Sequence, residues 1–269
     1  MAVPISVYMI TYNNADTVDT ALRSVQPFAA EIVVVDSGST DGTQEIVRKY
    51  TDRLLHRPFP GFREQYQYAA DQCTHPWALF LDADEEIGAA LQAELVATLE
   101  ANLRLPDTAQ VKGYQGHRRT FYIDRWILHG GWLPDYEVRL YDRRVGNWRG
   151  DLHAKLHVQG PLADFRHFIY HYTYQDISDQ LQTIDRYSNT AAGDMDRNGK
   201  RFSYLKLLGS PLVRFVREYV LKLGFLDGFP GLVVAVNTMF YVFNKHAKLW
   251  ERQRVKPDDV ARGKATKPE

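Results

Sequence analysis

The stretch Trp77-Ala-Leu-Phe-Leu-Asp-Ala-Asp-Glu-Glu86 decides how the fold of this chain is interpreted. Its apolar run, which ends at Leu81, predicts a short buried strand. Two carboxylates, Asp82 and Asp84, follow at the carboxyl end of that strand, where open α/β sheets bind their ligands. Carboxylates in such a pair suit Mg²⁺ or Mn²⁺ held jointly with substrate phosphates. Because an isolated D-x-D also occurs in solvated acidic turns, the rest of the chain has to decide between the two interpretations.

The composition is that of an ordinary globular protein, with 269 residues of which 45% are hydrophobic and 25% are charged. That is enough for a sizeable core, and a formal net charge of zero gives no electrostatic reason to expect a nucleic-acid partner. The single cysteine, Cys73, excludes an intrachain disulfide and predicts a buried thiol in a reducing, cytoplasmic compartment. The N-terminal Met1-Ala-Val-Pro lacks the basic region of a signal peptide, and no run of 18 apolar residues predicts a membrane-spanning helix.

Strand and helix patterns alternate through the first half of the chain. In addition to the quoted stretch, strands are predicted at 5–11, 31–36 and 53–56. Helices are predicted in the intervening segments and after the quoted stretch, at 16–25, 40–47, 62–73 and 89–103. Ser39 or Thr40 is expected to cap the second of these helices. The alternation predicts an α/β fold with a mostly parallel sheet and right-handed crossovers.

Three of the predicted strands end in polar residues, and in a parallel sheet those ends lie along one crevice. The residues at the three ends are Thr11, Tyr12, Asn13, Asp36, Asp82 and Asp84. A carboxylate such as Asp36 can accept the imide N–H of a uracil or the hydroxyl pair of a ribose, although turn and cap chemistry is the ordinary role of an acid there. The glycine-rich phosphate motifs of dinucleotide enzymes and P-loop NTPases are absent from the sequence.

Three segments, in their order and spacing, resemble the nucleotide-sugar half of inverting glycosyltransferase family 2: Ile10-Thr-Tyr-Asn-Asn14, Val33-Val-Val-Asp-Ser-Gly-Ser-Thr-Asp-Gly-Thr43 and Leu79-Phe-Leu-Asp-Ala-Asp-Glu85. The resemblance implies a GT-A fold, a nucleotide-diphosphate sugar donor, and Mn²⁺ or Mg²⁺ as cofactor. It implies that Asp84 binds the metal and that Asp82 binds the metal or the ribose. The donor-binding residues expected from it are Thr11, Tyr12, Asn13, Asp36 (to the base), Gly61, Asp82 and Ala83.

The chain also departs from the family pattern at two places. Tyr66-Gln67 stands where the family usually carries an Arg-Asn pair, and Asn14 stands where an acid is typical. Both departures concern contacts with the donor, so they bear on the details of donor binding and not on the class of enzyme.

The middle of the chain holds the candidates for activating the acceptor. An inverting transferase needs one carboxylate that takes a proton from the acceptor hydroxyl. In His129-Gly-Gly-Trp-Leu-Pro-Asp135 the aspartate follows a glycine pair whose backbone permits close approach to a sugar, so Asp135 is the first choice, although a turn residue after proline is the ordinary interpretation. Glu137 is the second choice and Asp151 the third. The resemblance implies that Arg139 lies behind this acid, near the diphosphate; a surface ion pair is the alternative.

The resemblance also implies a histidine ligand, because a histidine late in the catalytic domain often completes the metal shell in this family. His153 fits the spacing of that histidine best, and His171 is the alternative. A structural, hydrogen-bonded role is the more ordinary one for a single histidine.

Further motifs narrow the resemblance to a bacterial subgroup. The segments Trp132-x-Pro-Asp-Tyr-x-x-Arg-Leu140, Leu152-His-x-x-Leu156 and His171-Tyr-Thr-Tyr174 are similar to those of the lipopolysaccharide inner-core β-glucosyltransferases. This similarity implies UDP-glucose or another UDP-hexose as donor and a heptose-type acceptor on a lipid anchor.

The last third of the chain is predicted to be helical. The expected division is a catalytic domain at 1–173, a helical membrane-associating or oligomerising region at 174–255 and a disordered tail at 256–269. The apolar run at 232–243 is too short to span a bilayer, but a helix that is basic on one side and aromatic on the other can lie in an anionic headgroup layer. We therefore expect peripheral attachment to the inner face of the cytoplasmic membrane, with a helical hairpin packed on the catalytic domain or on another subunit as the alternative.

Together these observations predict an inverting, metal-dependent glycosyltransferase that moves a hexose, glucose being expected, from a UDP-sugar to a lipid-linked glycan such as lipopolysaccharide core. A nucleotidyltransferase is the rival enzyme, but it needs a Gly- and Lys-containing triphosphate loop, and residues 11–17 contain neither residue type. A membrane-associated scaffold with an inactive GT-A fold is the non-enzymatic rival. The sequence leaves open the sugar, the linkage and the oligomeric state, including a homo-oligomer.

Overall fold

The computed structural model describes the chain at residues 4–133, 135–150 and 154–254. It divides into two compact units. The first unit comprises residues 1–120 and 134–173, and the second comprises residues 121–133 and 174–269.

This division differs in one respect from the expected one. The first unit ends at residue 173, as in the expected division. Segment 121–133, which the sequence placed in the catalytic domain, belongs to the helical unit. The reason is its packing: the buried side chains of Tyr122 and Ile127 form a small core with Val234 of the last helix. The expected tail at 256–269 lies outside the described residues.

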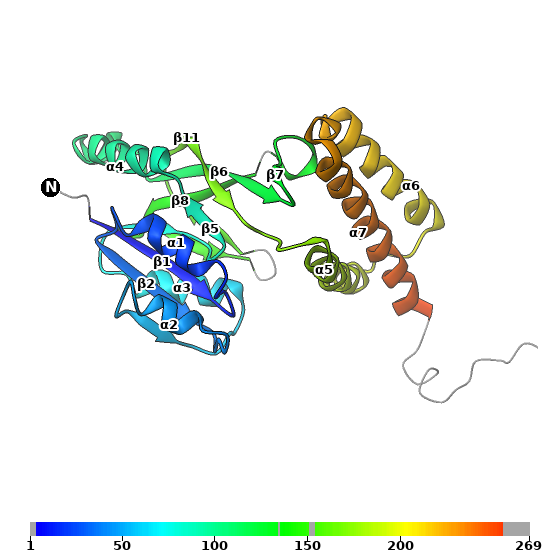
Figure 1. Ribbon diagram of the computed structural model, residues 1–269, viewed down its shortest axis with the longest axis horizontal. Helices are drawn as coiled ribbons and strands as arrows, with labels where there is room; N and C mark the ends of the chain where they lie inside the picture. The colour runs from blue at the N-terminus through cyan, green and yellow to red at the C-terminus, as the bar shows by residue number, and fades with distance from the viewer. Residues whose placement is uncertain (1–3, 134, 151–153, 255–269) are drawn as a thin grey trace, which may run out of the picture. The chain divides into compact units, whose positions relative to one another are not determined.

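The first unit is built on a mixed sheet (Figure 1). Its parallel half consists of β3 (Leu54–His56), β2 (Glu31–Asp36), β1 (Ile5–Thr11) and β4 (Trp77–Phe80), in that spatial order. The sheet continues through β8 (Tyr136–Asp142), β6 (Gly113–Tyr122), β11 (Leu162–His171) and β5 (Glu85–Ile87). Strand β8 is antiparallel to both of its neighbours, and β5 is antiparallel to β11. The sheet is thus mixed, because β8 runs antiparallel between β4 and β6 and β5 runs antiparallel to β11, whereas β6 and β11 are parallel to each other.

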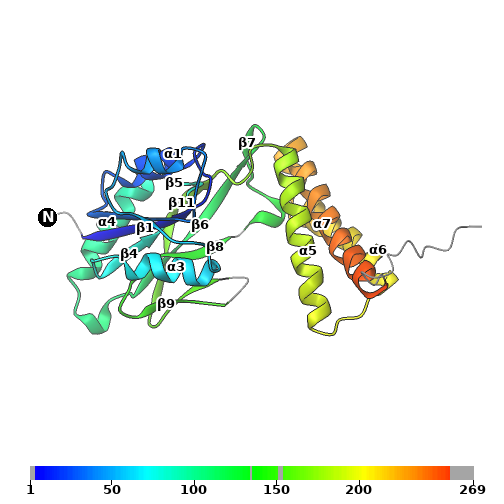
Figure 2. The same cartoon turned by 90° about the horizontal axis from the view of Figure 1, so that it is seen from below.

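Helices cover both faces of this sheet (Figures 1 and 2). The first four are α1 (Val18–Val25), α2 (Thr43–Val47), α3 (Phe62–Asp71) and α4 (Ala89–Leu103), and a 3₁₀ turn, η1, follows at Asp107–Ala109. Alternate residues of β1 point to opposite faces: Val7 packs in the core formed with α1, α2 and α4, whereas Tyr8 packs in the core formed with α3. The expected class, an α/β sheet with flanking helices plus a C-terminal helical region, is confirmed.

Two smaller features complete this unit. Strands β9 (Gly146–Arg149) and β10 (Lys155–Val158) form a separate antiparallel pair. The expected cap of α2 at Ser39 or Thr40 is wrong, since the helix begins after Gly42, which has φ 95°. Both residues are engaged elsewhere: the hydroxyl of Ser39 accepts a hydrogen bond from the backbone of Asn13, and the Thr40 N–H donates to the Asn13 side chain.

The second unit is largely helical. Its elements are β7 (Arg125–Trp126), η2 (Gly130–Trp132), α5 (Ile177–Arg197), α6 (Tyr204–Phe215), a π-helical turn η3 (Val216–Leu221), η4 (Gly224–Asp227) and α7 (Gly228–Arg254). The side chain of Asp176 caps α5 by accepting the N–H of Asp179 at 2.8 Å. Helix α7 packs against both α5 and α6, so it is the central helix of this unit (Figure 2).

One described helix, at residues 224–254, is long and apolar enough to cross a membrane by length and composition alone. The sequence predicted no such segment because the apolar run at 232–243 is short and is interrupted by Asn237, whereas the helix extends beyond it in both directions. Length and composition alone are weak evidence for a membrane span, because core helices of soluble proteins share them. In this helix, 39% of the most apolar 18-residue stretch is buried within the protein.

Candidate active site

The carboxyl ends of β1 and β4 open into a pocket of about 300 Å³ in the first unit. Residues from both strand ends and from α3 form its wall: Ile10, Thr11, Tyr12, Asn14, Ser37, Phe59, Phe62, Tyr66, Asp82, Ala83 and Asp84. Two of the three strand ends that the sequence placed along one crevice, those of β1 and β4, therefore meet at this pocket. This set contains Thr11, Tyr12, Asp82 and Ala83 of the predicted donor site and the predicted metal ligand Asp84.

Asp36, by contrast, does not line this pocket. Its carboxylate is 1% exposed and accepts the backbone N–H groups of Gly38 and Ser39, both at 3.0 Å, and the amide of Gln44 at 2.8 Å. Burial raises the pKa of Asp36, but these hydrogen bonds and those from the hydroxyls of Ser39 and Thr11 outweigh it and hold the pKa below its usual value. In this structure Asp36 closes the loop after β2, and its contact with the donor base stays a prediction.

Two other residues predicted to bind the donor also support loops. Asn13 has a left-handed backbone, φ 54°, and its side-chain oxygen accepts the N–H of Thr40 at 2.9 Å. Gly61 precedes α3 with φ 146°, where a Cβ would lie 2.7 Å from Glu64 Oε2. Asn13 thus supports the loop after β1, and Gly61 forms the turn before α3. Their contacts with the donor remain predictions.

Arg139 lies at the centre of the site and is completely buried. Its Nη2 lies 2.7 Å from Glu85 Oε1 and 3.2 Å from Glu137 Oε2, and its Nη1 lies 3.6 Å from Asp82 Oδ2. The guanidinium also stands over the ring of Phe80, 4.8 Å from its centroid. The Nε and Nη1 atoms have no hydrogen-bond partner among the described residues. The surface ion pair that was the alternative for Arg139 is therefore wrong, because β8 carries this side chain into the interior.

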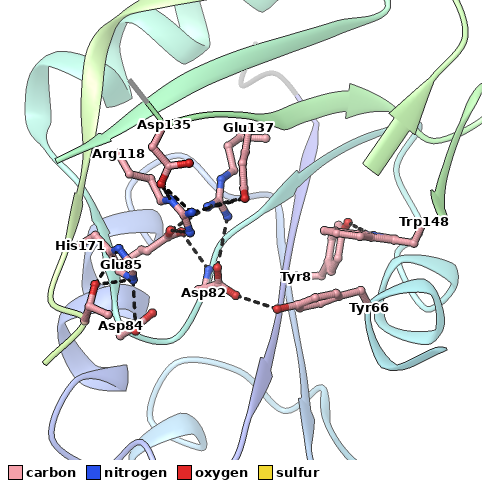
Figure 3. Close-up of polar contacts among 12 residues, drawn as sticks. Tyr8, Tyr66, Asp82, Asp84, Glu85, Arg118, Asp135, Glu137, Trp148 and His171 are labelled. Atoms are coloured by element: carbon pink, nitrogen blue, oxygen red, sulfur yellow. Dashed lines mark hydrogen bonds and ion pairs between the residues drawn. The ribbon is translucent and has the colours of Figure 1, made fainter. Parts of the chain in front are cut away.

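Arg118, on β6, joins the two carboxylates that are candidates for the catalytic base (Figure 3). Its Nε donates to Asp135 Oδ2 at 2.8 Å, and its Nη2 lies 2.7 Å from the same oxygen and 3.4 Å from Glu137 Oε1. Its Nη1 faces Glu85 Oε1 at 3.5 Å. Asp135 is thus bound through one oxygen, whereas both oxygens of Glu137 face arginines, because Oε2 contacts Arg139. Asp151, the third candidate, lies outside the described residues.

Asp82 is held between a tyrosine and the buried glutamate. The hydroxyl of Tyr66 donates to Asp82 Oδ1 at 3.2 Å, and the backbone N–H of Asp82 donates to Glu85 Oε2 at 3.1 Å. Burial, followed by the negative charge of Glu85, raises the pKa of Asp82 to about 6. The ring of Tyr66 stacks on Trp148 with centroids 4.4 Å apart, so an aromatic layer below the site fixes the position of its hydroxyl (Figure 3).

Asp84 lies beside a histidine from a distant strand. Oδ2 of Asp84 is 3.3 Å from Nε2 of His171, which ends β11. Burial raises the pKa of Asp84 and lowers that of His171, but their mutual hydrogen bond and charge outweigh burial, so the pKa of Asp84 is lowered and that of His171 is raised. His153 lies outside the described residues, so its predicted metal role cannot be placed beside that of His171.

The donor set of this site fits a divalent cation that a substrate diphosphate helps to bind. Four carboxylates (Asp82, Glu85, Asp135 and Glu137) face the two guanidiniums, and a fifth, Asp84, faces His171, which leaves negative charge in excess. Among the described residues, no three acidic, histidine or cysteine side chains form a complete metal cage. A carboxylate beside an imidazole supplies ligands that Mn²⁺ accepts, and Mg²⁺ in phosphate-transfer sites commonly uses only one or two carboxylates with substrate phosphates.

Sequence reasoning gave no role to two residues that organise this network. Glu85 is the last residue of the acidic motif, and Arg118 is one of two adjacent arginines in the segment that forms β6. An isolated arginine at position 139 between apolar residues was the available signal, because a buried cation requires a buried acid. Tyr66 was noted as a departure from the family pattern, and the structure shows that it contacts Asp82.

Comparison with known proteins gives a consistent result. Residues 6–158 match the family model described as "Glycosyl transferase family 2". The chain is 30% identical over 263 residues to "Lipopolysaccharide core biosynthesis glycosyltransferase LpsC" of Rhizobium meliloti, covering 94% of each chain. It is 26% identical to an uncharacterized glycosyltransferase of Rickettsia felis, covering 97% of this chain and 95% of the relative. A solved mannosyltransferase from Pyrobaculum calidifontis, in complex with GDP-Man and Mn²⁺, is 14% identical with a TM-score of 0.49, covering 96% of this chain and 77% of the other.

Proposed function

This chain belongs to glycosyltransferase family 2, and from that premise we propose that it moves a hexose, glucose in our expectation, from a UDP-sugar to a lipid-linked saccharide of the lipopolysaccharide core type, with inversion at the anomeric carbon. Membership of the family and the class of enzyme, a glycosyltransferase, are as the sequence predicted. The observation that carries the proposal is the acidic network around Arg139, which stands at the edge of a pocket made by the ends of β1 and β4.

The pocket supplies the chemistry that a nucleoside diphosphate requires. The exposed Tyr12 ring and the paired rings of Phe59 and Phe62, 5.0 Å apart, offer apolar surfaces for a base. Asp82 offers a carboxylate for ribose hydroxyls or for the metal. Nη1 of Arg139, which has no hydrogen-bond partner among the described residues, lies 3.6 Å from Asp82 Oδ2, so we assign Arg139 to the diphosphate.

Asp84 and His171, which lie 3.3 Å apart, would hold Mn²⁺ or Mg²⁺ together with the substrate diphosphate. Asp82 would bind the ion or the ribose, and His153 remains a further candidate ligand. When bound, such an ion stabilises the negative charge that develops on the departing diphosphate. The contact between Asp84 and His171 places both side chains in position before any ion arrives, which lowers the cost of ordering the ligands.

Asp135 is the carboxylate that we assign to deprotonating the acceptor hydroxyl. Its side chain is 37% exposed and therefore accessible to an acceptor. Both contacts with Arg118 use Oδ2, so the guanidinium orients the carboxylate and leaves Oδ1 to take the proton. Glu137 is less suited to this role, because Arg118 and Arg139 face both of its oxygens. We assign Arg118 to positioning Asp135.

The acceptor side of the proposal rests on similarity and on the second unit. The relative from Rhizobium meliloti is named as a lipopolysaccharide core biosynthesis glycosyltransferase, and such an acceptor is anchored in a membrane. The second unit carries an apolar helix at 224–254 and many basic residues. We therefore propose a peripheral location on the inner face of the cytoplasmic membrane, where a lipid-linked saccharide would be presented.

A hydrolysis screen tests the donor assignment. The purified chain is incubated with UDP-, GDP- and dTDP-sugars plus Mn²⁺ or Mg²⁺, and release of nucleoside diphosphate is measured. We expect UDP-glucose to be cleaved fastest, and we expect UDP with Mn²⁺ to raise the melting temperature, because a ligand of the native state stabilises it. If no nucleoside diphosphate raises the melting temperature in the presence of Mn²⁺, the proposed function is wrong.

An Asp84→Asn variant separates an active enzyme from an inactive scaffold. It should abolish transfer while keeping the native melting temperature without ligands, because the carboxylate is replaced by an amide of the same shape. An inactive scaffold would show no transfer before or after the change. The matched control is Asp107→Asn, which alters an exposed acid in η1 and should leave transfer unchanged.

A further inference from the structure

The second unit carries an exposed apolar surface along α6 and the π-helical turn that follows it. Only Pro211 of α6 is buried, whereas Leu205 is 86% exposed, Leu212 63% and Val213 68%. Val216 and Leu221 of the turn continue this surface. Single exposed apolar residues are ordinary, but a contiguous set on one element marks a contact surface. We call the exposed side of α6 and η3 the α6 face.

The same segment carries a strong excess of positive charge. Residues 198–226 contain six basic residues (Lys200, Arg201, Lys206, Arg214, Arg217 and Lys222) and one acidic residue, Glu218. Glu218 is buried and lies 2.7 Å from Arg214 and 3.4 Å from Arg217, so it presents no negative charge to solvent. The α6 face is therefore both apolar and cationic.

Apolar and cationic groups meet in one hollow of this face. A groove of about 380 Å³ is lined by the apolar Leu205 and Val213, the cationic Lys206, Arg214 and Arg217, and the small residues Gly209 and Ser210. Side chains of this combination suit a ligand that has a phosphate next to hydrocarbon.

The adjacent helix, α7, adds two basic side chains, Lys245 and His246, close to these cations. Burial lowers the pKa of Lys245, and the charges of Arg214 and Lys200 lower it further. Burial also lowers the pKa of His246, with additional effects from Lys245, Lys206 and Lys200. The sequence from 228 to 250 contains no acidic residue. These positive charges repel one another, so an external anion that binds near them would be attracted by all of them together.

We propose that the α6 face docks onto the headgroup layer of a bilayer rich in anionic phospholipids. Leu205, Leu212 and Val213 enter the interfacial region, while Lys206, Arg214 and Arg217 bind lipid phosphates. A second copy of this chain is disfavoured as the occupant, because a two-fold contact would bring two cationic faces together. The inference rests on the proposed membrane location, but it does not depend on which sugar or acceptor the enzyme uses.

Vesicle flotation of the purified full chain tests this surface. Vesicles of phosphatidylcholine alone are compared with vesicles that contain phosphatidylglycerol as well, at low and high salt. We expect the wild-type chain to float with the anionic vesicles only and to be released by salt, because interfacial binding combines apolar contact with a screened electrostatic attraction. Binding to neither kind of vesicle, or equally to both, would overturn the proposal.

Matched variants then locate the contact. Leu205→Glu with Leu212→Glu should weaken vesicle binding by about tenfold or more, since it removes apolar contacts and adds repulsion. Its control is Leu103→Glu with Leu105→Glu, which changes two exposed leucines of the first unit. Lys206→Glu should weaken binding by about fivefold or more, whereas Lys49→Glu, at an exposed position with the same change of charge, should leave it near the wild-type value.

Two further readouts keep the outcomes distinct. If the paired leucine change leaves vesicle binding intact but abolishes a dimer seen by size-exclusion chromatography, the face binds a second copy and the lipid proposal is wrong. Transfer to a soluble acceptor fragment is measured on the same variants and should be retained. If the wild-type chain fails in that assay but still binds anionic vesicles through the α6 face, the proposed function fails while the lipid surface stands.

Discussion

Arg139 and Glu85 form an ion pair from which solvent is completely excluded: Nη2 of the arginine lies 2.7 Å from Oε1 of the glutamate, and neither side chain is exposed. The two residues come from β8 and β5, which are not neighbours in the sheet. A buried pair contributes little net stability, but each charge requires the other to remain in place. This pair therefore fixes the acidic residues on and before β5 relative to those on and before β8.

Replacing Arg139 by methionine should destabilise the fold by about 3–5 kcal/mol, because it leaves the buried carboxylate of Glu85 without its partner. Urea denaturation followed by circular dichroism measures the change. The double variant with Glu85→Gln should recover much of the loss, since it removes the orphaned charge as well. Arg23→Met breaks an exposed ion pair with Asp19 and should leave the midpoint unchanged. If the two single changes simply add in the double variant, the pair is not coupled as described.

Removing one hydroxyl should separate the role of Tyr66 in the site from its role in packing. Tyr66→Phe keeps the stack on Trp148 but loses the hydrogen bond to Asp82. We expect kcat/KM to fall by about tenfold, in line with the loss of a hydrogen bond to a charged group, with little change in melting temperature. Steady-state kinetics measure the first quantity and calorimetry the second. Tyr187→Phe, at an exposed position, is the control, and an unchanged kcat/KM for Tyr66→Phe would argue against this role.

The assignment of the base predicts unequal effects for two neighbouring carboxylates. Asp135→Asn should lower kcat by about 10²–10⁴-fold, the usual contribution of general-base catalysis, while UDP still raises the melting temperature. Glu137→Gln should reduce kcat much less, because both oxygens of Glu137 face arginines. If Glu137→Gln proves the more severe change, the base is Glu137, and Asp135 serves to hold Arg118.

The metal assignment distinguishes two histidines. His171→Ala should raise the Mn²⁺ concentration for half-maximal activity by about tenfold or more, because loss of a ligand or of its support weakens metal binding to that degree. Titration of Mn²⁺ in the transfer assay, together with the shift in melting temperature that Mn²⁺ and UDP produce, gives both readouts. The same titration of His153→Ala is the comparison. Should only His153→Ala change the Mn²⁺ requirement, His171 is not a ligand.

The single thiol provides a test of the core beneath α3. Burial raises the pKa of Cys73 to about 11, so the folded protein should keep the thiol protonated and unreactive toward a disulfide reagent at pH 8, with one equivalent reacting in denaturant. Because the thiolate forms more easily in the unfolded chain, this group should also make the fold less stable as the pH rises through about 9 toward 11. Rapid labelling of the native protein at pH 8 would contradict this burial.

Local patterns were sufficient to predict the strands that carry the site. The apolar runs at 5–11 and 31–36 predicted β1 and β2 with their bounds as observed, because a buried strand needs continuous apolar residues. The helix predicted at 89–103 likewise matches α4 in both of its bounds. The second half of the sheet was not predictable in this way, since the antiparallel pairing of β8 between β4 and β6 depends on contacts between residues far apart in the sequence.

By itself, the sequence determined which acids stand at strand ends and that their neighbours resemble a nucleotide-sugar site, because strand ends and motifs are local features of the chain. Only the tertiary structure decided which side chain each acid contacts. Asp82, Asp84 and Glu85 are nearly adjacent in sequence, yet their partners are Tyr66, His171 and Arg139, brought in by α3, β11 and β8. The physical reason is that ionic and hydrogen-bonding partners are chosen by proximity in space, and a sheet places side by side strands that the sequence separates.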